Sequence, residues 1–94
     1  MKREIARFLD KEERLKQLPA RHAVRELAYA YLSEKFALGR DYTEREVNAI
    51  LLDWHTFGDH AALRRGLIDG GWLCRTRDGG RYWKNPDKKG EDEP

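Results

Sequence analysis

Cysteine is almost absent from this chain of 94 residues, which contains Cys74 alone. A single cysteine excludes a disulfide within the chain, and it cannot build a structural zinc site without other ligands. No apolar run approaches the roughly eighteen residues of a membrane-spanning helix, so we expect no membrane association. The first residues, Met1 to Ile5, carry charge instead of the apolar core of a secretory signal. The sequence therefore predicts a cytoplasmic protein.

Sequence signatures of catalysis are also missing. The chain has no Gly-x-Ser-x-Gly run, no phosphate-binding loop and no dinucleotide fingerprint, and one cysteine with scattered histidines does not make a nucleophile–base pair. His55 and His60, with Asp59 between them, are the nearest approach to a metal site. No Cys-x-x-Cys or His-x-x-x-His accompanies them, so we interpret His55 as a turn cap and His60 as a surface residue. We expect a protein that is not an enzyme and that binds no metal or cofactor.

Charge, by contrast, is abundant, because charged residues make up 38% of the chain and hydrophobic residues 39%. This length and apolar content suffice for one small domain with one modest core. The net charge of +2 is spread unevenly. Residues 72–84 contain four cations and one anion, whereas residues 85–94 contain two lysines and four acidic residues. The sequence predicts a single domain over residues 1–84 and a disordered acidic tail over residues 85–94.

Apolar side chains recur at helical spacing over residues 21–37, 43–55 and 59–69, which predicts three helices. Thr43 followed by Glu46 is a capping box, in which each side chain accepts a hydrogen bond from the other residue's backbone amide. The predicted core combines the inward apolar side chains of these helices with those of the segment that follows: Val24, Leu27, Tyr31, Leu32, Phe36, Val47, Ile50, Leu51, Leu63, Leu67, Leu73 and one or both of Tyr82 and Trp83.

Turn residues punctuate the second half of the chain. Asp59 is positioned to cap the third helix, and Gly70 and Gly71 end it. The segments 72–77 and 81–84 flank Asp78-Gly79-Gly80, which predicts a hairpin. Two helices joined by a short turn and followed by a hairpin predict an α+β winged helix-turn-helix with three helices and a two-stranded wing. A weaker helical stripe predicts an extra N-terminal helix, as a helical extension over residues 1–19.

Two longer runs resemble a known bacterial family. They are the Tyr-Thr-Glu-Arg-Glu-Val-Asn run at residues 42–48 and the Asp-x-x-x-Leu-Arg-Arg run at residues 59–65, with supporting matches at residues 32–36 and 82–83. The resemblance covers roughly residues 15–84 and points to family number 2087 among the catalogued domains of unknown function. Members of that family often follow a separate helix-turn-helix domain in transcriptional regulators. The resemblance implies a transcription-regulatory setting and implies no catalytic residue.

The winged-helix hypothesis gives the third helix the task of reading DNA. If Leu63 and Leu67 face the core, the turn of about 100° per residue places Ala61, Ala62 and Arg65 on the outer face. Arg65 suits a bidentate contact with guanine, and the alanines suit a thymine methyl group. Four hairpin cations are predicted to hold phosphates: Arg75, Arg77, Arg81 and Lys84. Duplex DNA is the predicted partner, and a plain solvated helix face with an ordinary basic hairpin is the alternative.

Arg64 lies at the flank of the buried face of the same helix. We predict a structural ion pair between Arg64 and Asp41, Glu46 or Asp53, which would fix the orientation of two helices. An anion site between Arg64 and His55 is the alternative for this residue.

Aromatic residues support a second functional class, because the chain has many large rings for so small a core. We expect some of these rings at the surface, where they would bind a partner: Tyr29, Tyr42, Trp54, Phe57, Trp72 and Trp83. Ile5, Phe8 and Leu9 of the N-terminal helix would instead dock on a second protomer. The alternative function is therefore a protein-interaction or dimerisation module with no DNA binding of its own.

Overall fold

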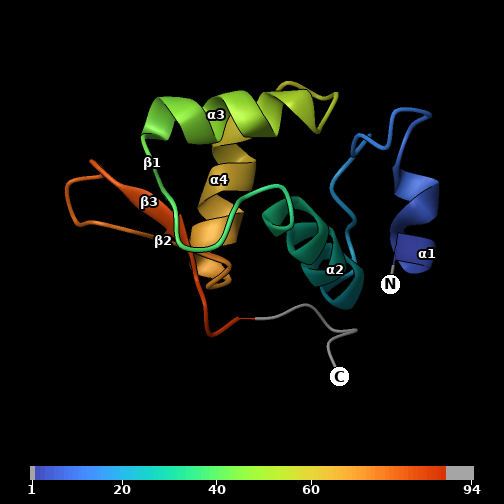
Figure 1. Ribbon diagram of the computed structural model, residues 1–94. Helices are drawn as coiled ribbons and strands as arrows, with labels where there is room; N and C mark the ends of the chain where they lie inside the picture. Colours follow the sequence, from blue (N-terminus) through green and yellow to red (C-terminus); the bar gives the residue numbers. More distant parts are fainter. Residues whose placement is uncertain (1, 89–94) are drawn as a thin grey trace.

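Three main helices and one antiparallel sheet make up the α+β fold, and a short helical segment precedes them (Figure 1). The computed structural model describes residues 2–88. Its elements in chain order are α1 (Lys2–Ile5), the 3₁₀ helix η1 (Ala6–Phe8), α2 (His22–Ser33), β1 (Asp41–Tyr42), α3 (Glu44–Asp53), α4 (His60–Asp69), β2 (Leu73–Arg75) and β3 (Tyr82–Lys84). Within this described part, no helix is long and apolar enough to cross a bilayer.

The sheet has the strand order β1-β3-β2, with both pairings antiparallel. The hairpin of β2 and β3 confirms the predicted strands, and Cys74 pairs with Trp83 in its register. A third strand, β1, pairs Tyr42 with Tyr82. The prediction of a two-stranded wing is therefore corrected to a sheet of three strands. Two residues are too few to show the alternation by which a strand is recognised in a sequence.

The helix boundaries follow local signals. The capping box of α3 is confirmed, because Thr43 Oγ1 accepts from the Glu46 amide at 3.1 Å and Glu46 Oε1 accepts from the Thr43 amide at 2.9 Å. The helix α2 ends at Ser33, four residues before the predicted end. There the backbone tightens, and the Phe36 amide bonds to the Ser33 carbonyl at 3.1 Å. This tighter turn buries the Phe36 ring.

The core lies where α2, α3 and α4 meet the inner face of the sheet. Leu63 and Leu67 are fully buried, which confirms the predicted orientation of α4. Tyr82, and not Trp83, is the inward ring of β3, since Trp83 is only half-buried. Three predicted core residues lie only partly buried against this cluster: Val24, Leu27 and Ile50.

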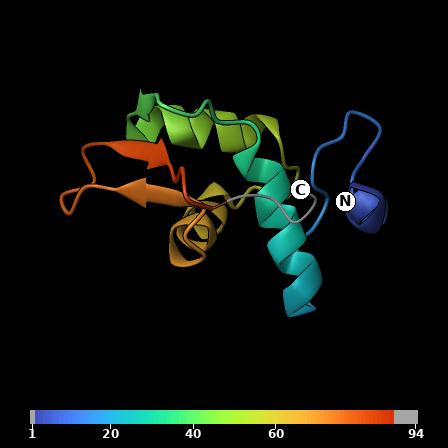
Figure 2. The same cartoon turned by 60° about the horizontal axis from the view of Figure 1, so that its bottom comes forward.

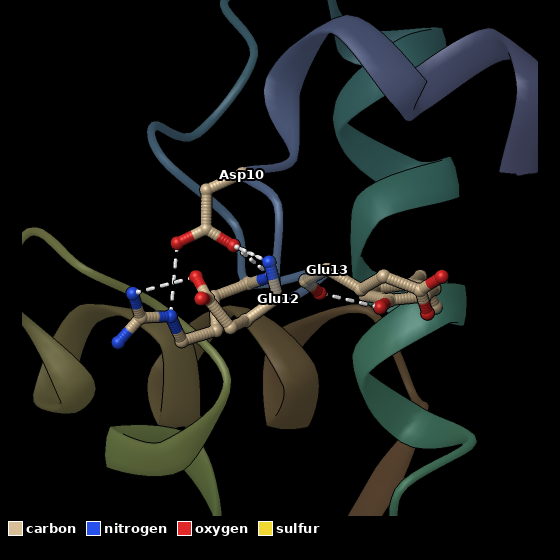
Figure 3. A network of polar contacts seen from close by, with 5 residues as sticks. Asp10, Glu12 and Glu13 are labelled. Atoms are coloured by element: carbon tan, nitrogen blue, oxygen red, sulfur yellow. Dashed lines mark hydrogen bonds and ion pairs between the residues drawn. The ribbon is translucent and has the colours of Figure 1, made fainter.

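The predicted N-terminal helical extension does not run through residues 1–19. The helical segment ends at Phe8, and the chain then turns (Figure 3). The cause is local, because Asp10 Oδ1 accepts from the amides of Glu12 and Arg14, at 3.0 and 2.8 Å. An aspartate that bonds nearby amides in this way competes with helix formation. The following Leu15 is fully buried and bonds through its backbone to Trp54, beside the turn that follows α3.

The N-terminal apolar residues serve this chain's own core. Ile5 is buried, and Phe8 and Leu9 pack against the core cluster, where α1 lies beside α2 (Figures 1 and 2). Three of the six rings expected at the surface are also buried: Tyr29, Tyr42 and Trp72. These buried side chains are not available to a partner, and the predicted homodimer contact stays a prediction that depends on the partly buried Phe8 and Leu9.

The first residues of the predicted tail, 85–88, make contacts with the folded domain. Asn85 Nδ2 donates to the Gly71 carbonyl at 2.8 Å, and the Lys88 ammonium lies 4.7 Å from the centre of the Trp72 ring. These contacts hold the segment that follows β3 against the residues that directly follow α4. The rest of the predicted tail, residues 89–94, lies outside the described residues.

Candidate nucleic-acid interface

The outer face of α4 forms the floor of a cavity of about 780 Å³, here called the α4 cavity. From α4 itself the lining includes Ala61, Ala62, Arg64, Arg65 and Gly66. Ala61, Ala62 and Arg65 are exposed, as the helical phase predicts. Because the two alanines have short, exposed side chains, a ligand can approach the helix backbone closely beside Arg65.

Two walls flank this floor. One wall comes from the start of α3 and from the hairpin, with Glu44, Arg75 and Tyr82. The other comes from Tyr29 of α2 and from Leu18 in the loop before it. Both views of the fold place α4 between the hairpin and α2 (Figures 1 and 2). A partner that contacts α4 therefore meets the hairpin on one side and α2 on the other.

Arg64 bridges α4 to α3. Its Nη1 donates to Asn48 Oδ1, and its Nη2 lies 3.8 Å from Glu44 Oε2. The structural ion pair is thus formed with Glu44, and not with Asp41, Glu46 or Asp53 as the sequence suggested. Glu44 and Asn48 are one helical turn apart on α3, so both can face the same residue on the neighbouring helix.

Two of the three predicted partners of Arg64, Asp41 and Glu46, are engaged elsewhere. Glu46 belongs to the capping box and lies 3.5 Å from Arg40. Asp41 pairs with Arg81 at 3.3 Å. These contacts leave the Arg64 guanidinium to hold α3 and α4 together at the edge of the α4 cavity.

Glu44 also receives a hydrogen bond from the sheet, since the Tyr82 hydroxyl donates to its Oε1 at 3.0 Å. Burial raises the pKa of Tyr82, and the bond to Glu44 adds to the effect. The hydroxyl therefore stays protonated at neutral pH. The carboxylate of Glu44 is shared between Tyr82 and Arg64, which joins α3, α4 and β3 at one point of the wall.

The hairpin turn is held by its own side chains. Thr76 Oγ1 donates to Asp78 Oδ1 at 2.8 Å, and the Gly80 amide donates to the same oxygen at 2.9 Å. The bond from Gly80, followed by the one from Thr76, lowers the pKa of Asp78. Arg75 Nη1 reaches the carbonyls of Thr76 and Arg77 at 3.3 and 3.2 Å. These bonds order the turn and place the Arg75 guanidinium beside it.

The hairpin cations do not share one surface. Arg75 lines the α4 cavity, and Arg77 is exposed in the turn. Arg81 pairs with Asp41 and stacks over the Trp83 ring, 4.8 Å from its centre. Arg75 pairs with Tyr82 in the sheet, and one position further the Thr76 amide donates to the Arg81 carbonyl. Alternation along the strands therefore sends Arg81 to the opposite face of the sheet from Arg75.

Arg81 and Lys84 instead line a second depression of about 370 Å³, here called the Trp83 hollow. It also contains Leu38, whose exposed fraction of 64% is the highest among the large hydrophobic residues that the structure describes. The seven predicted DNA-binding residues thus fall into two groups around two different depressions, with Arg77 in the turn.

The contacts of His55 confirm that this residue caps the turn after α3. The ring is buried, its Nδ1 lies 2.6 Å from the Leu51 carbonyl, and its Nε2 accepts from the Asp59 amide at 2.9 Å. These two bonds assign a neutral ring with the proton on Nδ1. Both nitrogens are occupied by backbone groups, which removes the basis of an anion site between His55 and Arg64. Across residues 2–88, no three His, Cys, Asp or Glu side chains gather as a metal site would require.

Sequence reasoning missed the role of Tyr29 in the wall of the α4 cavity. The ring packs against Gly66, so closely that a Cβ atom on residue 66 would lie 2.1 Å from the Tyr29 hydroxyl oxygen. The available signal was the glycine itself. A glycine in the middle of an amphipathic helix weakens the helix and often permits the close approach of another element.

Comparison with known proteins identifies a family. A family described as "Uncharacterized protein conserved in bacteria (DUF2087)" matches residues 14–84, which is most of the chain. The chain belongs to this family, as its sequence runs suggested. Neither a curated protein nor a solved structure matches it.

Proposed function

We propose that this member of the bacterial family DUF2087 is a winged helix-turn-helix domain that binds duplex DNA in a transcription-regulatory protein. In this proposal α4 enters the major groove, and the hairpin holds the adjacent backbone. The topology supports the assignment, because a helix and a short strand precede the pair α3 and α4, and a hairpin follows them. That is the element order of a helix-turn-helix with a wing.

The observation that carries the proposal is the shared position of Arg65 and Arg75. They come from α4 and from the hairpin, and both line the α4 cavity. Arg65 stands beside the exposed Ala61 and Ala62, so a base edge can approach the helix there. A guanidinium among short side chains suits contact with guanine, and alanine suits the thymine methyl group.

The charges around the α4 cavity favour a polyanion only moderately. Three guanidiniums, from Arg64, Arg65 and Arg75, face the carboxylates of Glu44 and Asp69. Because Glu44 is already bonded to Arg64 and Tyr82, Arg65 and Arg75 are opposed mainly by Asp69. Arg77 adds one further exposed cation at the turn. We therefore expect modest, salt-dependent affinity with few phosphate contacts.

The test is a fluorescence-anisotropy titration of a labelled random-sequence duplex at about 50 and about 200 mM salt, a range over which phosphate contacts weaken measurably. Arg75→Ala should lower the slope of log affinity against log salt by about 0.9, the value of one phosphate contact. Arg81→Ala removes the same charge from the same hairpin, but from the outer face, and should leave the slope unchanged. This pair separates a defined interface from general attraction between a basic protein and DNA.

Arg65→Ala addresses sequence reading. After selection of a preferred duplex, this substitution should cost about 1–3 kcal/mol at that site and relax the preference at one base pair. It should have a smaller effect on a random duplex. Absence of wild-type binding to any duplex at about 50 mM salt, where phosphate contacts are strong, would contradict the DNA-binding proposal.

A protein-interaction module is the second candidate, and the Trp83 hollow favours it. Leu38 is 64% exposed there, beside the half-buried Trp83. An exposed leucine next to a tryptophan resembles the apolar centre of a protein interface. Sedimentation analysis of the wild type and of Leu38→Ser discriminates this candidate. Self-association that is lost in Leu38→Ser, together with absent duplex binding, would favour it over DNA binding.

A further inference from the structure

The side chain of Tyr29 has a feature that its packing does not explain. The residue is only 7% exposed, and the tip of its ring lies against Gly66 in the wall of the α4 cavity. Within residues 2–88 its hydroxyl makes no hydrogen bond. The neighbouring buried tyrosine on the same helix differs, because the Tyr31 hydroxyl donates to the Glu13 carbonyl at 2.5 Å (Figure 3).

The hydroxyl oxygen reaches solvent at the cavity wall, because the one fully buried side-chain polar atom without a partner in the described residues is His60 Nδ1. Phenylalanine would fill the same space beside Gly66, and the fold would lose no hydrogen bond. The hydroxyl at this position therefore adds nothing to the packing of α2 on α4. Its position at the cavity wall points to a bond with an atom that arrives from outside.

The surroundings define the chemistry of that atom. Burial raises the pKa of Tyr29, while the charge of Arg25 acts in the opposite direction. The hydroxyl is thus protonated at neutral pH and can donate. Tyr29 lines the α4 cavity together with three arginines, Arg64, Arg65 and Arg75. A hydroxyl donor in a cavity with this lining suits an anionic oxygen, and phosphate oxygens receive such bonds from tyrosine and arginine.

Two carboxylates also lie near Tyr29. Glu26 and Asp69 both raise its pKa through their charge. Glu26 Oε1 accepts from the indole nitrogen of Trp72 at 3.2 Å, so it is engaged within the fold. Asp69 lines the α4 cavity and limits how many anionic groups it can accept. One phosphate oxygen, approached by the Tyr29 hydroxyl, fits this balance.

We propose that the Tyr29 hydroxyl donates a hydrogen bond to a backbone phosphate oxygen of bound DNA, on the side of α4 opposite the hairpin. The inference rests on the proposed function and adds a second point of support to it. Arg75 contacts the backbone at one wall of the α4 cavity, and Tyr29 contacts it at the other. DNA is then oriented across α4 by both walls, since phosphate contacts fix register and orientation.

Tyr29→Phe tests the proposal, because it removes one oxygen atom and leaves the ring against Gly66. We expect this variant to melt close to the wild-type temperature, because the fold loses no hydrogen bond. Its affinity for duplex DNA should fall about tenfold, the value of a hydrogen bond to a charged group at the low end. The salt slope should stay at the wild-type value, because the lost group is neutral and releases no counterion. The loss should be equal on two unrelated duplexes, since a phosphate contact carries no sequence information.

Tyr31→Phe is the matched control. It removes a hydroxyl from the same helix, but one that is bonded within the fold to Glu13. This variant should melt below the wild type and keep its affinity at temperatures where it is folded. The two variants together distinguish a hydroxyl that serves binding from one that serves stability.

Each other outcome overturns the inference in a recognisable way. Wild-type binding with unchanged affinity in Tyr29→Phe would refute the phosphate contact and leave the proposed function standing. A loss on one duplex alone would assign the hydroxyl to a base. A Tyr29→Phe protein that melts well below the wild type would show that the hydroxyl has a partner within the fold. Absence of wild-type binding would overturn both the proposed function and this inference.

Discussion

Replacing Gly66 by alanine tests the contact on which the α4 cavity depends. In an exposed helix interior this change stabilises a protein by about 1 kcal/mol, because alanine has the higher helix propensity. Gly66 lies in the interior of α4, with ordinary helical neighbours on both sides. Helix propensity alone therefore predicts a more stable variant.

The packing of Tyr29 predicts the opposite sign. The new Cβ would lie 2.1 Å from the hydroxyl oxygen, 2.3 Å from Cζ and 2.7 Å from Cε1. Carbon atoms in contact are normally about 3.5–4.0 Å apart, so the ring or the helix must move by more than about 1 Å. Such overpacking typically costs about 1–3 kcal/mol. Since two ring carbons and the hydroxyl oxygen are involved and the ring is buried, we expect a cost in the upper part of this range, which leaves a net loss of about 2 kcal/mol after the gain in helix propensity.

Urea unfolding followed by circular dichroism measures this loss, and a second background isolates its cause. In Tyr29→Leu the ring tip is gone, so Gly66→Ala should there recover its intrinsic gain of about 1 kcal/mol. The sign of the glycine substitution should thus reverse between the two backgrounds, which gives a coupling free energy between residues 29 and 66 of about 3 kcal/mol. Stabilisation by Gly66→Ala in the Tyr29 background would refute the described packing of α2 on α4.

Two further predictions concern stability. Leu63→Ala and Leu67→Ala should each cost about 2–5 kcal/mol in urea unfolding, because both side chains are fully buried, whereas Leu52→Ala, at a half-exposed position of α3, should cost much less; equal losses at all three would contradict the assigned helix faces. The pKa of Asp10 is lowered from its ordinary value of 3.8, mainly by the bond from the Arg14 amide, so the stabilisation it provides is complete above that value and is lost as the pH falls through the lower folded pKa. The measurement compares urea midpoints of the wild type and Asp10→Asn at about pH 6 and about pH 2.5, on either side of the ordinary aspartate pKa. Asp10→Asn should be less stable than the wild type at the higher pH, and the difference should shrink at the lower pH. A difference in midpoint that does not depend on pH would contradict this role of Asp10.

The main helices could be predicted because their signals are local. The capping box of Thr43 and Glu46 fixes the start of α3 within a single turn. The phase of Leu63 and Leu67 places Arg65 on the outer face by geometry alone. Asp59 caps α4 through the Ala62 amide, three residues away. In each case the cause and its effect lie within about one helical turn, where sequence spacing reports directly on contact.

The elements that escaped prediction depend on distant partners. β1 exists because Tyr42 pairs with Tyr82, forty residues later, and two residues carry no visible pattern. Leu15 is buried because its backbone bonds to Trp54 and Thr56 across the turn after α3. The division of the hairpin cations has a similar cause. Only the register of β2 against β3 shows that Arg75 faces α4 and that Arg81 faces away.

The candidate interface therefore combines a predictable part with a part that only tertiary packing reveals. Arg65 belongs to the first, and Tyr29 belongs to the second, because it reaches α4 only where Gly66 provides no side chain. The glycine that weakens α4 as a helix is what lets α2 form one wall of the α4 cavity. If the domain binds DNA as proposed, stability and binding are linked at Gly66 and separable at Tyr29. An alanine at residue 66 displaces the whole ring, whereas a phenylalanine at residue 29 removes only the oxygen that the fold itself does not use.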